Sequence, residues 1–220
     1  MNNEPFLLFL KSMLPPLEKG AVMTIEITAI SVGIGVLIGI FGGIARVSKN
    51  PFLLVPSTIY VEVIRGTPLL AQLFIVYFGL PSLGINLPPF TAAVMAMGIN
   101  SGAYVTEIFR GGIQSVEKGQ MEAARSLGLS YFQAMRYVIL PQALKRVLPP
   151  LGNEFIAMLK DSSLASTIAI AELMRVGREI TSRTFRSFEV LGVVALLYLA
   201  ITLPLSLVVR YMERRMSTSD

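Results

Sequence analysis

The sequence predicts an all-α integral membrane protein with about five transmembrane helices, and three observations support this. Of its 220 residues, 53% are hydrophobic and 15% are charged, whereas about a quarter of a soluble domain is charged. Several apolar runs reach the roughly 20 residues that a helix needs to cross a bilayer. Clusters of Lys and Arg follow some of these runs, as is typical of cytoplasmic loops.

The first apolar run covers residues 20–45, and five glycines between residues 33 and 43 favour close helix packing in lipid. Arg46 and Lys49 follow it, so this end is expected in the cytoplasm and the N-terminus outside. Residues 1–19 are interpreted as an amphipathic lead-in at the membrane surface, because their short apolar piece ends at Pro15-Pro16.

The second apolar run, residues 54–80, is interrupted by "EVIRGTP". Pro68 removes a backbone donor and Gly66 loosens the helix, so a kink is expected there. The uncharged Gly/Pro-rich residues 79–89 predict an outside turn. Residues 90–109 form the third span.

Residues 110–146 form the strongest cytoplasmic signal, since they carry six lysines and arginines spread over a long polar stretch. Residues 147–171 are a fourth apolar segment with embedded charges, and residues 188–209 are the fifth span, which leaves the C-terminus in the cytoplasm. The connection 172–187 carries four arginines, yet five crossings place it outside. A re-entrant fourth segment remains the alternative, because both models leave an excess of positive charge inside.

The residue inventory argues against an enzyme. The chain has no cysteine and no histidine, so it lacks thiol nucleophiles and the commonest catalytic base and metal ligand. It has no G-x-x-x-x-G-K-[ST] phosphate loop, which excludes ATP hydrolysis by this chain. The net charge of +5 is attributed to cytoplasmic loops rather than to nucleic-acid binding, because no basic surface interleaved with aromatic residues is evident.

A short motif lies within the polar stretch. Glu122-Ala123-Ala124, three residues, Gly128, nine residues and then "VILP" resemble the EAA loop of permease subunits in bacterial ABC importers. Val138 departs mildly from the I-x-L-P ending of that pattern. The stretches "EVIRGTPLLAQL", "NSGAYVTEIFRGGIQSVEKGQMEAA" and "LPPLGNEFIAMLKDSSLAS" resemble the polar amino-acid uptake branch, and most closely the permeases for arginine, lysine and histidine.

This resemblance implies a type I ABC importer permease fold, with residues 1–220 as a single transmembrane domain in the bacterial cytoplasmic membrane. It implies three kinds of partner besides lipid: a dimer of ATPase subunits that hold ATP and Mg²⁺, a second permease subunit (identical or a close paralogue), and an extracellular substrate-binding protein. No cofactor is expected in this chain, and no nucleic acid among its partners. Glu122, Ala123, Ala124 and Gly128 would form the contact with the ATPase.

The residues of this motif independently predict a docking element. They indicate two short amphipathic helices, with Gly128 permitting the sharp turn between them. Such an element can enter a groove on a soluble partner. The alternative is a helix lying on the lipid headgroups.

Charged residues inside spanning segments are expensive and usually functional. Glu154 and Asp161 are seven residues apart, which places them on one helical face about 10 Å apart along the axis. An amino acid with a cationic side chain would offer one positive group to each carboxylate. The alternative is a structural pairing of these acids with Lys160 or with Arg65 of the neighbouring span.

Other polar residues complete the predicted substrate site. Asn100 and Ser101 lie mid-way along the third span and offer amide and hydroxyl contacts. The stretch "KDSSLAS", which includes Ser163, is expected to break its helix and to cap the next one. Freed N–H groups there would receive the substrate carboxylate. Two further pairs, Glu62 with Arg65 and Glu107 with Arg110, are expected to neutralise each other within their helices.

The sequence therefore predicts the permease subunit of an ATP-driven importer for polar, and specifically basic, L-amino acids. A second hypothesis is a secondary transporter driven by an ion gradient, with Glu154 and Asp161 as proton or sodium sites. A third, an intramembrane enzyme, is disfavoured because the chain lacks histidine and cysteine.

Overall fold

The computed structural model describes residues 6–217, which are almost entirely helical and contain no β-strand. The α-helices are α1 (Phe6–Val47), α2 (Pro51–Arg65), α3 (Leu69–Phe74), α4 (Pro89–Gln114), α5 (Lys118–Ser126), α6 (Tyr131–Ala134), α7 (Leu140–Asp161), α8 (Leu173–Thr184) and α9 (Ser187–Ser217). Short π-helical turns cover Ile75–Gly79 and Met135–Ile139, and 3₁₀ turns cover Leu80–Leu83 and Ser162–Ile168.

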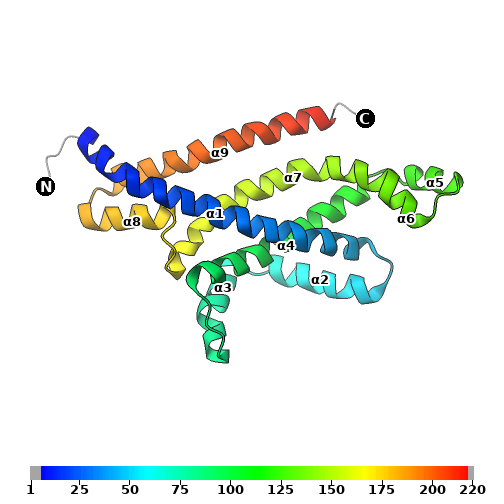
Figure 1. Cartoon of the computed structure of the whole chain (residues 1–220), viewed down its shortest axis with the longest axis horizontal. Coiled ribbons are helices and arrows are strands. Elements are labelled where there is room, and N and C mark those ends of the chain that lie inside the picture. Colours follow the sequence, from blue (N-terminus) through cyan, green and yellow to red (C-terminus); the bar gives the residue numbers. More distant parts are fainter. Residues whose placement is uncertain (1–5, 218–220) are drawn as a thin grey trace.

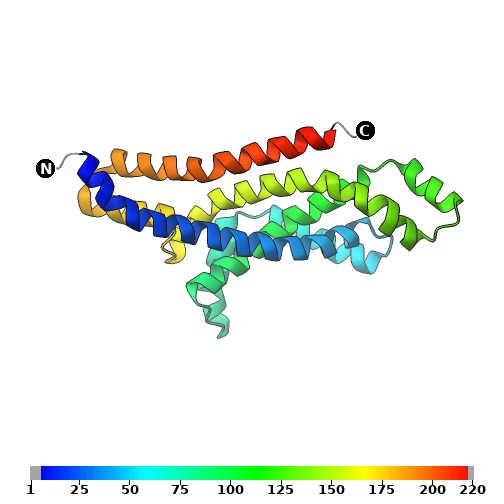
Figure 2. The same ribbon diagram turned by 45° about the horizontal axis from the view of Figure 1, so that its top comes forward.

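Four long helices run along the molecule and form its body (Figure 1): α1, α4, α7 and α9. The short helices α5 and α6 project beyond one end of this body, and α8 lies at the other end beside the start of α1 (Figures 1 and 2). By length and apolar composition, α1 and α9 each suffice to cross a membrane, and the bent pair α2–α3 qualifies if it counts as one span. Helix α4 is central and largely buried.

The glycines of α1 allow its close approach to α4, as predicted. A Cβ atom at Gly35 would lie 2.7 Å from the Ser101 side chain, and one at Gly39 would lie 2.3 Å from Val105. Gly33 is different, because a Cβ atom added there would meet no other atom within 4 Å. The two backbones therefore meet along one glycine face, which holds α4 at the centre of the bundle.

The predicted lead-in over residues 1–19 is continuous with the first span in its described part. From Phe6 onward the chain is helical and continues through Pro15 and Pro16 without interruption; residues 1–5 lie outside the described range. Phe9, Met13 and Leu17 recur every four residues and are buried in a cluster with residues of α8 and α9. The prolines remove two backbone hydrogen-bond donors, but this packing stabilises the helix by more than their loss costs.

The kink predicted at "EVIRGTP" is confirmed, and it is a sharp break. The segments Pro51–Arg65 and Leu69–Leu83 meet at 100°. The buried amide of Gln72 donates hydrogen bonds to the carbonyls of Ile64 and Thr67, at 2.8 and 3.2 Å. Because Gln72 supplies donors that the broken helix lacks, carbonyls at the break remain satisfied.

The position of residues 172–187 was left open by charge counting. In the structure α7 and then α8 lead from the α5–α6 end to the end where α1 begins, and α9 runs back beside α7 (Figure 1). Residues 172–187, which include α8, therefore lie at the end of the body opposite α5 and α6 (Figure 1).

Candidate functional site

A cavity of about 610 Å³ opens where the α2–α3 break faces α4 and α7. Such a volume is in the range of small-ligand sites. Its charged residues are two acids and one base, so the lining carries more negative than positive charge. The lining residues are Arg65, Gly66, Thr67, Pro68, Leu69, Asn100, Tyr104, Glu154, Ala157, Met158, Asp161 and Leu164.

The two predicted acids, Glu154 and Asp161, both line this cavity. Ser101 of α4 donates a hydrogen bond from its hydroxyl to Oε1 of Glu154, at 3.0 Å. Asp161 is the last residue of α7. The neighbouring Lys160 lines a different cavity, so it does not stand between the two carboxylates.

The predicted Asn100 also lines the cavity, and its amide donates to the side-chain oxygen of Gln72 at 3.0 Å. Since Gln72 in turn holds the α2–α3 break, Asn100 connects α4 to the bend in the cavity wall. Gln72 was missed by sequence reasoning. A buried amide beside a proline break is the signal that would have revealed it.

Ser163 does not join these residues. It lies in a separate cavity of about 430 Å³, with Lys160, Tyr198 and residues of α8 and α9. The predicted helix break does occur, because the chain changes from α-helix to a 3₁₀ turn at Ser162. Successive residues of a 3₁₀ turn point about 120° apart. Asp161, at the end of α7, and Ser163, two residues later in the turn, therefore face different cavities.

The prediction that "KDSSLAS" caps the next helix is also wrong. Glu172 caps α8, with its carboxylate accepting hydrogen bonds from the backbone N–H groups of Met174 (2.8 Å) and Arg175 (2.6 Å). Its side chain is fully buried and also accepts from the hydroxyl of Tyr198 at 2.9 Å. Sequence reasoning missed Glu172 because its burial depends on α1 and α9, which are distant in the chain.

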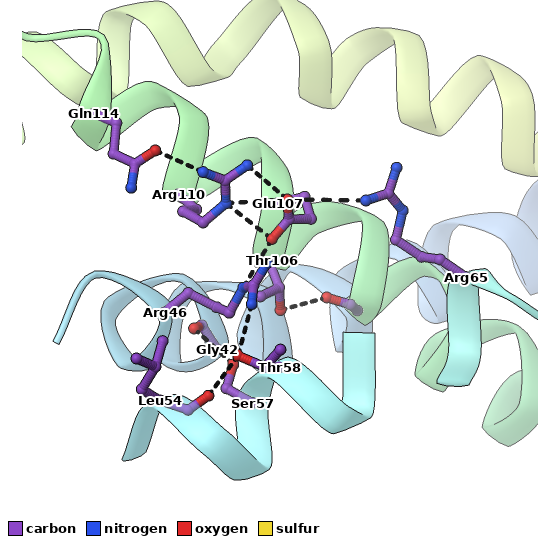
Figure 3. Close-up of polar contacts among 11 residues, drawn as sticks. Gly42, Arg46, Leu54, Ser57, Thr58, Arg65, Thr106, Glu107, Arg110 and Gln114 are labelled. Atoms are coloured by element: carbon purple, nitrogen blue, oxygen red, sulfur yellow. Dashed lines mark hydrogen bonds and ion pairs between the residues drawn. The ribbon is translucent and has the colours of Figure 1, made fainter. Parts of the chain in front are cut away.

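Arg65 does not pair with Glu62, which is exposed. Its guanidinium lies 3.8 Å from the carboxylate of Glu107 (Figure 3). The same group lies 5.0 Å from the centre of the Tyr104 ring. The predicted pair of Glu107 with Arg110 is confirmed at 2.7 Å. Arg46 of α1 also joins Glu107, at 3.0 Å.

The EAA-like segment adopts the predicted helix and glycine turn. Helix α5 ends at Ser126, and Gly128 has a φ of +86°. The N–H groups of Gly128 and Leu129 bond back to the carbonyls of Arg125 (3.0 Å) and Ala124 (3.3 Å), which is the hydrogen-bond pattern of a Schellman helix end.

The second predicted short helix is not separate, because α6 continues through the π-helical turn into α7. Ala124 packs inward, whereas Glu122 and Ala123 are exposed. Large apolar side chains also face outward around the turn: Leu127 is 85% exposed and Phe132 is 71% exposed. An exposed apolar surface of this kind is typical of a binding site for another protein.

Residues 35–218 match the family described as "Binding-protein-dependent transport system inner membrane component". The chain belongs to this family. It is thus a membrane-embedded permease subunit of an ABC importer, and such subunits are not themselves enzymes.

Relatives of this permease are permease proteins of amino-acid transport systems. The glutamine transport system permease protein GlnP of Escherichia coli (strain K12) is 46% identical over 205 residues, which cover 92% of this chain and 94% of GlnP. The arginine transport system permease protein ArtQ of Bacillus subtilis (strain 168) is 38% identical over 209 residues, covering 94% and 95% of the two chains.

Solved structures confirm the type I ABC importer permease fold. A crystal structure of an amino acid ABC transporter with histidines matches with a TM-score of 0.91 and 48% identity, covering 97% of this chain and 100% of that one. An inward-facing structure of the MetNI methionine ABC transporter matches with a TM-score of 0.80 at 19% identity, covering 93% and 98%. The latter supports the fold alone.

Proposed function

We propose that this permease subunit carries polar L-amino acids with a cationic side chain, and that the cavity beside the α2–α3 break is their site. The observation that carries this proposal is the charge of the cavity wall, where Glu154 and Asp161 face a single arginine, Arg65. An amino acid with a cationic side chain brings two positive groups and one carboxylate. Each of its charges therefore finds an opposite charge in the cavity, as charges at membrane depth require.

A neutral polar amino acid such as glutamine is the second candidate. The 46% identity to an Escherichia coli glutamine permease favours it, whereas the 38% identity to a Bacillus subtilis arginine permease agrees with the first. With glutamine bound, one of the two acids would remain without a positive partner from the ligand. Burying such a carboxylate costs more than pairing it, which is why the cationic cargo is preferred.

We assign Glu122, Ala123, Ala124 and Gly128 to the contact with the ATPase subunit. The support is the projecting position of α5 and α6 (Figure 1) and the exposed apolar side chains around their turn. This end would lie in the cytoplasm, so that α8 and the start of α1 face outside, toward an extracellular substrate-binding protein. A second permease subunit would complete the pathway, and α9, which runs back toward the α5–α6 end, would place the C-terminus in the cytoplasm.

Uptake into liposomes tests this proposal. The permease is reconstituted with its ATPase and binding protein, and entry of labelled arginine and glutamine is compared with and without ATP. ATP-dependent uptake of arginine in excess over glutamine is expected. A preference for glutamine would overturn the cationic cargo, and uptake driven by an ion gradient without the ATPase would support the secondary-transporter alternative.

A further inference from the structure

One carboxylate, that of Glu107, faces three arginines from three different helices (Figure 3). Arg46 of α1 and Arg110 of α4 donate hydrogen bonds to it at 3.0 and 2.7 Å. Arg65 of α2 lies 3.8 Å away. The three guanidinium groups repel one another and compete for the same two oxygens, so they are not held equally.

Arg65 is the least tightly held of the three. Its distance to Glu107 exceeds that of a hydrogen bond, and its side chain is 42% exposed, against 14% for Arg46 and 31% for Arg110. Arg46 also donates to the hydroxyl of Thr58, at 2.6 Å. Arg65 instead packs over Tyr104 and lines the cavity that holds the two acids.

Arg65 therefore lies between two sources of negative charge. On one side is Glu107, and on the other are Glu154 and Asp161 of the cavity wall. A guanidinium that moved toward the cavity acids would neutralise one of them and weaken the site for a cation. A guanidinium that stays beside Glu107 leaves both acids available.

We propose that Glu107 is a positioning residue for Arg65, holding its guanidinium at the cavity rim so that Glu154 and Asp161 remain available to a cationic substrate. Glu107 itself does not line the cavity and acts through Arg65. The proposal rests on the proposed function for the identity of the cargo alone. The position of Arg65 can be measured without any cargo.

The natural chain contains no cysteine, so a single thiol gives a clean probe of the charge inside the cavity. Ala157→Cys places that thiol on the cavity wall. In the full-length permease bound to its ATPase, the rates of modification by a cationic and an anionic methanethiosulfonate reagent are compared, following label on the permease. The ratio of the two rates rises as the cavity becomes more negative.

Glu107→Gln should lower the ratio of cationic to anionic modification by about tenfold, because Arg65 moves toward the cavity acids. Most of this shift should be absent when Arg65 is also replaced by Gln. The shift that remains without Arg65 comes from the loss of the Glu107 charge itself, which acts on the thiol directly. Glu62→Gln, an exposed change on the same helix as Arg65, should leave the ratio unchanged. An equal shift with and without the Arg65→Gln substitution, or no shift, would overturn the positioning role.

A second variant keeps the test independent of how well Glu107→Gln folds. Arg110→Gln removes the strongest competitor for Glu107 and should draw Arg65 closer to it. The ratio should therefore rise, and it should rise by more when Arg65 is present than when Arg65 is replaced by Gln. A fall would contradict the proposal. Binding of labelled arginine to the same variants separates the two claims: an Arg65-dependent shift without any arginine binding would leave the positioning role intact and reject the proposed cargo.

Discussion

Ser101 on α4 donates its hydroxyl hydrogen to Glu154 on α7, at 3.0 Å, and this bond links the central helix to the acidic wall of the cavity. The side chain of Ser101 is itself fully buried against the glycine face of α1. The orientation of a proposed substrate ligand therefore depends on how closely α1 and α4 pack.

Ser101→Ala should weaken arginine binding by roughly tenfold or more, because a hydrogen bond to a charged group contributes about 1.5–3 kcal/mol. Equilibrium binding of labelled arginine to the permease–ATPase complex measures this. The matched control is Ser115→Ala at the end of α4, whose hydroxyl bonds only to a carbonyl of its own helix. Equal losses in both variants would show that the effect is not specific to Glu154.

Gly39→Ala should lower the thermal stability of the purified protein, because the new Cβ would lie 2.3 Å from the side chain of Val105. Overpacking of this kind costs roughly 1–3 kcal/mol. Gly33→Ala, on the same helix but with no atom within 4 Å of the new Cβ, should be neutral or slightly stabilising. A thermal shift assay in detergent that ranked the two variants alike would reject the assigned α1–α4 interface.

Gly128→Val should abolish coupled transport while the protein still inserts into the membrane. Gly128 has a φ of +86° with nothing within 4 Å of its Cβ position, so the substitution strains the backbone, by about 1–2 kcal/mol, rather than causing a clash. Gly119→Val, in α5 and equally free of neighbours, is the control. Co-purification of the ATPase and uptake are the two measurements. Normal uptake by Gly128→Val would mean that docking does not need this turn.

Glu172→Gln should destabilise the protein by about 1–3 kcal/mol, since an amide cannot accept all three hydrogen bonds that the buried carboxylate receives. Glu179→Gln should cost no more than about 0.5 kcal/mol, because Glu179 is half exposed and pairs with Arg175 at the surface. Thermal unfolding in detergent compares the two. Equal midpoints would contradict the role of Glu172 as the buried cap of α8.

Features that depend on local sequence were predicted correctly. The break at "EVIRGTP", the end of α7 at "KDSSLAS" and the turn at Gly128 each follow from Pro, Ser or Gly in the chain itself. The shared face of Glu154 and Asp161 follows from helical spacing alone, and both residues line the cavity.

Several features that depend on contacts between distant segments were not predicted. Arg65 was assigned to Glu62, three residues away, but it lies beside Glu107 on another helix. The helix through Pro15 and Pro16 persists because of packing against α8 and α9. The burial of Glu172 and the direction of Ser163 likewise depend on α9. Helical spacing cannot predict such contacts, because it relates only residues of the same helix.

The most direct test of the acidic cavity compares arginine with citrulline, its uncharged isostere, in equilibrium binding to the permease–ATPase complex. The wild-type protein should bind arginine more tightly. Glu154→Gln and Asp161→Asn should each weaken arginine binding by about 2 kcal/mol, or roughly 30-fold. At least one of the two variants should leave citrulline binding nearly unchanged, because only one acid faces the α-amino group. Equal affinity for the two ligands in the wild type, or arginine binding unaffected by both substitutions, would contradict the account.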